Sequence, residues 1–185
     1  KKIAEESMVL LKNDNVLPLN KNEKIAVIGE FAVKPRFQGG GSSHINSFKI
    51  SSLMDALKEY ENVTYIKGFS ADEDCYEEAL AQEALNAAKS ADKVVICAGL
   101  PDSFESEGYD RSHMHLPECQ NRLIREITAV QPETIVVLHN GSPVEIPWLS
   151  DVKGLLEAYL GGQAVGEAVA DILFGNVNFC RLSLL

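Results

Sequence analysis

The sequence predicts an α/β fold, a mostly parallel open sheet with helices on both faces (an α/β sandwich). Apolar, β-rich runs recur along the 185-residue chain, and segments with an apolar period near 3.6 residues lie between them. Most connections are short, and this alternation of strand, helix and strand is typical of parallel sheets covered on two sides. The length fits one domain, residues 1–185, with a single core.

Five runs are predicted to be strands. KVVICAG (93–99) and TIVVLHNG (134–141) are nearly continuous apolar runs, which is typical of strands that are buried on both faces. The other three are KIAVIG (24–29), VTYIKG (63–68) and GLLEAYLG (154–161).

Four apolar stripes predict helices. The stripes are Leu53, Leu57 and Tyr60; Leu80, Ala84, Ala87 and Ala91; Leu123, Ile124, Ile127 and Val130; and Val169, Ile172 and Leu173. Ser51 and Ser52 precede the first stripe, and Pro117 and Glu118 open the third, so helix starts are expected there. The acidic run 72–74 is expected to favour the dipole at the start of the second helix.

Charge and composition restrict the partners and the location. The net charge of −10 without a basic patch argues against nucleic acid and against an anionic membrane surface. No apolar run is long enough to span a membrane, and the first residues do not resemble a signal peptide. Four cysteines without a C-x-x-C pair suggest free thiols in a reducing compartment, so a cytoplasmic location is expected.

Two segments that follow predicted strands are much longer than ordinary connections. They are residues 30–50 after the first strand and 101–117 after the third. In open parallel sheets the ligand usually lies beyond the carboxyl ends of the strands, so both loops are expected to meet at the functional edge.

The first loop contains RFQGGGSSHINS (36–47). Its three glycines allow a ligand to approach the backbone closely, and Ser42, Ser43 and His44 follow them. The glycine spacing matches neither the dinucleotide nor the P-loop pattern, so no nucleotide and no other cofactor is expected. A polar loop that contacts a neutral hydroxylated ligand or a partner domain fits better.

The second loop contains FESEGYDRSHMHLP (104–117), which is rich in carboxylates. A Glu beside Gly108 and Tyr109, on a loop that folds over a site, can be shielded from water; this raises its pKa and allows it to donate a proton near neutral pH. The alternative is that Asp110 and Arg111 pair to hold the loop and that Glu105 and Glu107 are simply exposed charges.

Other chemistries find weaker support. His113 and His115 form an H-x-H pair, but nothing marks the third ligand that a catalytic zinc requires, so no metal site is assigned. Neither GGSSH nor NGSPV has the G-x-S-x-G form of a hydrolase nucleophile.

At these residues the chain resembles the α/β sandwich domain of glycoside hydrolase family 3, and within that family the bacterial β-glucosidases. Four ordered motifs carry the resemblance over nearly the whole chain: ESMVLLKNDNVLPL (6–19), QGGGSSHI (38–45), SEGYDR (106–111) with the following LP, and GGQAVGEAVADILFG (161–175).

The resemblance implies a retaining glycosidase that hydrolyses terminal, non-reducing β-linked sugars such as β-D-glucosides. It implies that Glu107 is the general acid/base, that Tyr109 stacks on the aglycone side of the pocket, and that Ser42 and Ser43 lie in the loop that closes over the site. The nucleophilic Asp would come from a preceding barrel domain. No segment matches that barrel, so the chain is expected to be a fragment with little turnover of its own.

One departure and one alternative remain. The family usually has N-P-S-G-R-L near the end of this domain, whereas this chain reads NVNFCRLSLL (176–185), with Phe179 at the position of the Pro. The alternative function is a sugar-binding or interdomain-packing module whose acidic loop contributes recognition without chemistry.

Overall fold

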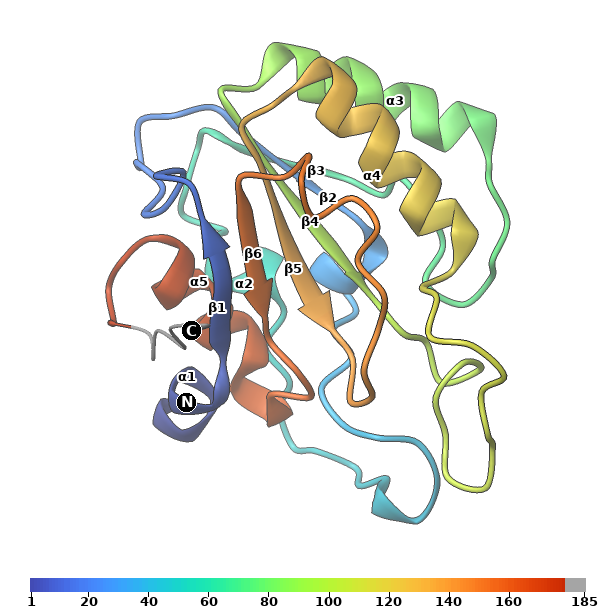
Figure 1. Ribbon diagram of the computed structural model, residues 1–185. Coiled ribbons are helices and arrows are strands. Elements are labelled where there is room, and N and C mark those ends of the chain that lie inside the picture. The colour runs from blue at the N-terminus through green and yellow to red at the C-terminus, as the bar shows by residue number, and fades with distance from the viewer. Residues whose placement is uncertain (179–185) are drawn as a thin grey trace.

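The computed structural model describes residues 1–178. Phe179 and the rest of the C-terminal segment, where the sequence departs from the family pattern, lie outside the described residues. Within the described part the chain forms a six-stranded sheet with helices on both faces, as predicted (Figure 1).

The strand order in the sheet is β1-β6-β5-β4-β2-β3. The five strands β2 to β6 are parallel to their neighbours, and only β1 runs antiparallel, against β6. The strands are β1 (Val9–Asn13), β2 (Ile25–Ile28), β3 (Val63–Ile66), β4 (Lys93–Gly99), β5 (Thr134–His139) and β6 (Gly154–Glu157). Every residue of β2, β5 and β6 is buried, and so is every residue of β4 after Lys93, so these four strands form the centre of the core.

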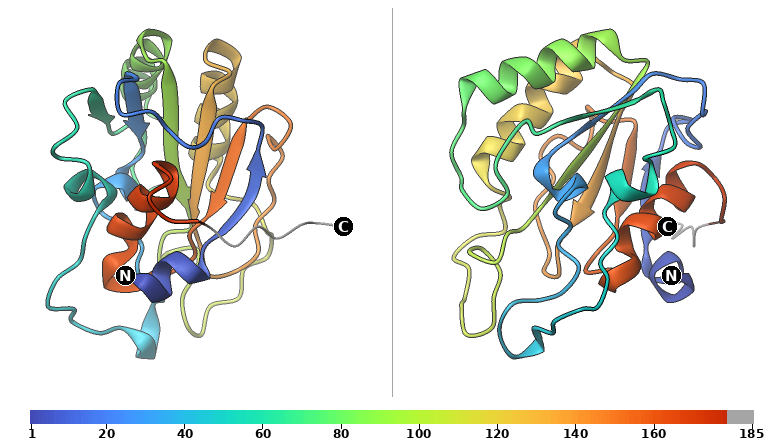
Figure 2. Two further views of the ribbon diagram at one scale, coloured as in Figure 1. Left: turned by 90° about the vertical axis from the view of Figure 1, so that its left-hand side faces the viewer. Right: turned by 180° about the vertical axis from the view of Figure 1, so that it is seen from behind.

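The helices form two layers. α3 (Glu78–Ser90) and α4 (Glu118–Val130) pack together on one face of the sheet, while α1 (Lys2–Ser7), α2 (Leu53–Ala56) and α5 (Val165–Leu173) pack together on the other (Figures 1 and 2). Three short 3-10 helices complete the described part of the chain: η1 (Glu30–Ala32), η2 (Gly41–Ser43) and η3 (Gly162–Ala164). Within residues 1–178, no helix combines the length and the apolar character needed to cross a bilayer.

All five predicted strands are present, but four of them end earlier than predicted. The last, predicted as 154–161, ends at Glu157, and Tyr159, two residues later, has a φ of 51°. A left-handed residue cannot continue a strand, so the chain turns there. β1 and α1 were not predicted, because the segment 6–19 was recognised only as a family motif.

The predicted helix starts at Ser52 and Pro117 are confirmed. Ser52 forms a capping box with Asp55, and Pro117 is the N-cap of α4. The first helix is nevertheless a single turn, so Tyr60 of the predicted stripe lies beyond it.

The prediction for the acidic run 72–74 is wrong. α3 begins only at Glu78, and the run belongs to the preceding loop. The Asp74 carboxylate instead accepts a hydrogen bond of 2.8 Å from the backbone N–H of Cys119, in the first turn of α4. Asp74 therefore caps a helix that is distant in the sequence, which a local pattern cannot show.

Candidate functional site

The two long loops meet at one edge of the sheet, beyond the carboxyl ends of the parallel strands (Figure 1). η2 lies at the tip of the loop that follows β2, and the loop after β4 contains the acidic motif. The expected juxtaposition of the two loops is therefore confirmed.

Glycines allow the backbones of the two loops to touch. A Cβ placed on Gly40 would lie 2.8 Å from Ser106 Oγ, and a Cβ on Gly41 would lie 2.4 Å from Glu107 Cβ. Gly41 also has a φ of +84°, which L side chains rarely adopt. The glycines were predicted to admit a ligand, but the atoms that approach Gly40 and Gly41 in this structure belong to the second loop.

Glu107 is exposed and is held by the first loop. Its Oε2 accepts a hydrogen bond of 2.5 Å from the backbone N–H of Ser42. The Ser42 side chain and the Ser42 N–H both lower the pKa of Glu107 from its ordinary value of 4.5. The sequence-based expectation of a shielded carboxyl with a raised pKa is therefore wrong for this chain, because the loop does not bury Glu107.

Glu105, the other glutamate of the acidic loop, has different surroundings. Its side chain is only 15% exposed, and its Oε2 lies 3.0 Å from Arg36 Nη1. The same oxygen accepts a 3.0 Å hydrogen bond from the Gly141 N–H, and its Oε1 accepts one from the Ser142 hydroxyl. Among the described residues, Glu107 has no ion pair of this kind. Arg36 thus fixes the Glu105 carboxylate, whereas the Glu107 carboxylate has no cationic partner among the described residues.

Tyr109 and Ser43 lie near this contact but do not join it. Tyr109 is 57% exposed and lines a depression of about 410 Å³ beside the acidic loop. The Ser43 hydroxyl donates to backbone carbonyls of its own loop, Gly39 O at 3.3 Å and Gly40 O at 3.4 Å. Of the four predicted site residues, the structure brings Glu107 and Ser42 into direct contact.

Arg111 braces the loop differently from the pairing considered above. Within residues 1–178, Asp110 and Arg111 form no ion pair with each other. Arg111 Nη2 instead donates a 2.6 Å hydrogen bond to the carbonyl of Pro143, in the segment after β5.

The two histidines of the loop face each other and a carboxylate. The rings of His113 and His115 stack with centroids 5.1 Å apart, and His115 Nδ1 lies 2.8 Å from Glu145 Oε2. No group of three or more potential metal ligands occurs among the described residues.

Buried polar groups at the ends of β5 and β6 were missed by the sequence analysis. Burial raises the pKa of Glu157 to about 7, against hydrogen bonds from the Tyr159 N–H and from Asn140. Burial lowers the pKa of His139 to about 4. His139 is the last residue of β5 and Glu157 the last residue of β6. Both follow apolar residues, so the sequence pattern predicts that they are buried in a strand but not that they carry shifted pKa values.

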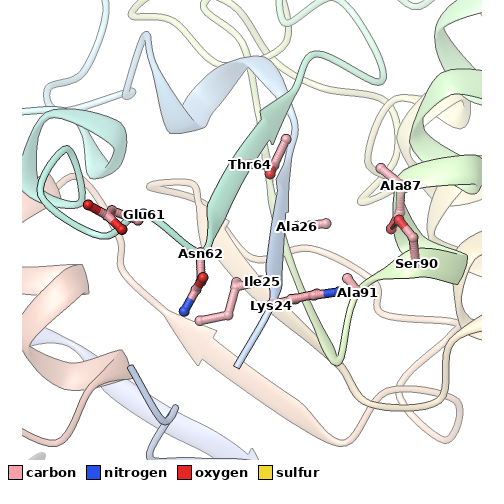
Figure 3. A pocket seen from close by; sticks show the side chains of 9 residues that line it. All are labelled: Lys24, Ile25, Ala26, Glu61, Asn62, Thr64, Ala87, Ser90 and Ala91. Atoms are coloured by element: carbon pink, nitrogen blue, oxygen red, sulfur yellow. Dashed lines mark hydrogen bonds between the residues drawn. The ribbon is translucent and has the colours of Figure 1, made fainter. Parts of the chain in front are cut away.

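A second hollow, of about 280 Å³, lies at the amino ends of β2 and β3. Figure 3 shows its lining side chains spread along the strand ends and α3 instead of converging on one point. It lies at the opposite edge of the sheet from Glu107 and has no cluster of titratable groups, so the loop edge remains the candidate site.

Comparisons with known proteins agree with this architecture. The model of the family described as "Glycosyl hydrolase family 3 C-terminal domain" matches residues 8–184. Thermostable beta-glucosidase B from Acetivibrio thermocellus is 54% identical over 180 residues, which is 95% of this chain and 24% of that protein. An exo-alpha-(1->6)-L-arabinopyranosidase from Bifidobacterium longum is 44% identical over 187 residues, 95% of this chain and 25% of that protein.

The solved structures agree as well. A crystal structure of a family 3 beta-glucosidase from Bifidobacterium adolescentis superposes with a TM-score of 0.89 at 47% identity, covering 94% of this chain and 26% of that one. The chain thus spans about a quarter of the length of these relatives. With a family match that covers nearly all of its residues, this chain belongs to the family of glycosyl hydrolase family 3 C-terminal domains.

Proposed function

We propose that this chain is the acid/base-bearing domain of a retaining β-glucosidase that hydrolyses terminal, non-reducing β-D-glucosyl residues. Glu107 is the general acid/base, and the nucleophile is a carboxylate of a barrel domain that lies outside residues 1–185. The chain by itself then has little or no turnover, because retaining hydrolysis requires two carboxyl groups about 5 to 5.5 Å apart. The β-glucosidase among the relatives, at 54% identity, supports the choice of sugar.

The observation that carries this proposal is the difference between the two carboxylates of the loop. Glu107 projects from the edge of the sheet without a cationic partner among the described residues, and only Ser42 holds it. Glu105 is occupied by Arg36 and by donors from the segment after β5. A proton donor must be free to meet the departing oxygen of the substrate, so Glu107 fits that role and Glu105 does not.

The hydrogen bond from Ser42 has a consequence for the mechanism. In this chain it stabilises the charged form of Glu107, whereas the first step of hydrolysis needs the protonated form. A nucleophilic carboxylate across the scissile bond, together with the exclusion of water by the substrate, raises the pKa of a neighbouring carboxyl. Glu107 then protonates the leaving oxygen, and as a carboxylate it later removes a proton from the attacking water.

Exposed apolar side chains in the loop that holds Glu107 support an adjoining domain. Phe48 is fully exposed, and Ile45 is 64% exposed, both in the loop after β2. Exposed large apolar side chains are common at interfaces. We assign them to the surface that faces the barrel domain, and the net charge of −10 leaves nucleic acid and anionic membranes as poor partners.

Glu107→Gln in the full-length protein tests the proposal. The variant should lower kcat/KM for phenyl β-glucoside by about 10² to 10⁴-fold, because its leaving group needs protonation. Dinitrophenyl β-glucoside, whose leaving group needs no proton, should form the glycosyl-enzyme at nearly the normal rate. An equal loss on both substrates would contradict proton donation by Glu107.

A module for sugar binding or domain packing is the second candidate. It is favoured by the lowered pKa of Glu107, since a charged carboxylate on an exposed loop accepts hydrogen bonds well. In that case Glu107→Gln would weaken binding of all substrates alike and would leave no dependence on the leaving group.

The proposed location is the cytoplasm. Cys75, Cys97 and Cys119 carry free thiols, which suits a reducing compartment. Fractionation of the native host, with the protein followed by an antibody, checks this directly.

A further inference from the structure

Arg36 crosses from one long loop to the other. Its side chain is 4% exposed although it belongs to the loop after β2. Nη2 donates a 2.6 Å hydrogen bond to the carbonyl of Glu105, and Nη1 donates to the carbonyl of Leu100. The guanidinium thereby satisfies backbone carbonyls of the loop after β4, in addition to the Glu105 carboxylate.

The Glu105 carboxylate extends this connection to a third loop. Besides Arg36, it accepts hydrogen bonds from the Gly141 N–H and the Ser142 hydroxyl, which follow β5. A Cβ on Gly141 would lie 2.9 Å from Glu105 Oε1. The absence of a side chain at Gly141 therefore allows its backbone to approach the carboxylate. The Arg36–Glu105 ion pair therefore ties together the segments after β2, β4 and β5, and Asp102 Oδ1, an exposed carboxylate 3.2 Å from Arg36 Nη2, adds a second contact to the loop after β4.

Glu107 lies two residues after this fixed point. Two residues span at most about 7 Å of extended chain, so the position of Glu105 restricts the position of Glu107. The Glu107 carboxylate itself is held by Ser42, at the tip of the first loop. The neighbouring ion pair adds a second restraint, which acts on Glu107 through the backbone.

We infer that Arg36 and Glu105 are positioning residues that hold the acid/base loop, and with it Glu107, in register with the Gly-Ser loop. This inference rests on the proposed function of Glu107. A carboxylate displaced by about 1 Å from the departing oxygen loses about 10²-fold in rate, so weakening the ion pair should impair proton donation and little else.

The test measures kcat/KM of the full-length protein on phenyl and dinitrophenyl β-glucosides. Glu105→Gln, which keeps the size and removes the charge, should lower the value for phenyl β-glucoside by about 10²-fold and the value for dinitrophenyl β-glucoside by less than about fivefold. An equal loss on both substrates, or no loss on either, would overturn the inference.

Glu133→Gln is the matched control. Glu133 is also a carboxylate that bridges segments, with Lys93 Nζ at 2.5 Å and Lys153 as a second partner, but it does so at the amino ends of β4, β5 and β6. It should alter thermal stability without changing the ratio of the two substrates. If Glu133→Gln changes that ratio as much as Glu105→Gln does, the effect is general destabilisation and the inference fails.

Ser142→Ala provides a second variant in case Glu105→Gln does not fold. It removes the hydroxyl donor and leaves the Arg36–Glu105 ion pair in place, so a smaller selective loss of about tenfold on phenyl β-glucoside is expected. An unchanged substrate ratio in Ser142→Ala, with Glu105→Gln unfolded, would count against the inference.

Azide separates failure of the inference from failure of the proposed function. It attacks the glycosyl-enzyme without needing a base and releases the glycosyl azide, so it should restore turnover of dinitrophenyl β-glucoside in Glu107→Ala. It should have no comparable effect in Glu105→Gln, which keeps Glu107. If Glu107 variants behave as expected and Glu105→Gln does not, only the positioning role fails. If azide rescues the Glu105 variant alone, Glu105 is the acid/base and both assignments are wrong.

Discussion

Replacing Gly41 by alanine tests whether contact between the two loops sets the ionisation of Glu107. A Cβ at this position would lie 2.4 Å from Glu107 Cβ, 1.0 Å closer than the 3.4 Å at which ordinary contact begins (3.4 minus 2.4). The backbone there has a φ of +84°. The substitution therefore adds a steric conflict to a conformational one.

The two effects have different consequences. A non-glycine residue in the left-handed region costs about 1 to 2 kcal/mol. Gly41, Ser42 and Glu107 are exposed, so the steric conflict is relieved by a local separation of these residues, with the Arg36–Glu105 ion pair kept, and it adds little to that cost. Separation breaks the hydrogen bond from the Ser42 N–H to Glu107, and the pKa of Glu107 should return from its lowered value toward 4.5.

Gly162→Ala is the control for the conformational cost. Gly162 has a φ of +69°, and nothing lies within 4 Å of a Cβ placed there. It should lose about the same 1 to 2 kcal/mol of unfolding free energy and leave the pKa of Glu107 unchanged.

Two assays give the answer. Urea unfolding followed by the fluorescence of Trp148, the only tryptophan and a fully buried one, gives the free energies. A pH titration of side-chain carboxyl signals by NMR, assigned with Glu107→Gln, gives the pKa. If Glu107 titrates in Gly41→Ala as it does in the unmodified chain, or if Gly162→Ala shifts it equally, the loop contact does not control its ionisation.

Two further predictions concern the core. Gly166→Ala would place a Cβ 2.1 Å from the carbonyl carbon of Ser52, where α5 crosses α2. This overpacking should lower the free energy of unfolding by about 3 kcal/mol. A loss below about 1 kcal/mol in urea titration would contradict the packing. Glu157→Gln tests the buried carboxyl whose pKa is about 7. Between pH 4.5 and 7 the folded state keeps a proton that the unfolded chain has lost. The stability of the unmodified chain relative to the variant should therefore fall with rising pH, by about 3 kcal/mol in all. The comparison with the variant is needed because His139, with its pKa lowered to about 4, imposes the opposite slope between about pH 4 and 6.5. A stability difference that stays constant from pH 4.5 to 7 would show that Glu157 does not titrate as proposed.

The central architecture could be predicted because its signals are local. The run 93–99 is a strand over the predicted residues, and the stripe around Ile124 and Ile127 is the buried face of α4. The helix from Glu78 was also predicted, but its buried face is formed by Ala81, Ala84 and Ala88 and is rotated from the predicted stripe. Small side chains give a weak periodic signal, so packing decides which face is covered.

The edges of the fold were less predictable. β1 pairs antiparallel with β6 although about 140 residues separate them in the chain. An edge strand with one buried residue lacks the apolar run that identified the others.

The sequence by itself determined that a parallel sheet would bring the loops after β2 and β4 to one edge, because every parallel strand ends on the same side. It also placed Glu107 in the family motif. Only the tertiary structure decided the states of the two carboxylates: Arg36 lies 69 residues from Glu105, and Ser42 lies 65 residues from Glu107. The charge and freedom of a carboxylate depend on which donors face it, and between irregular loops no spacing in the sequence specifies those donors.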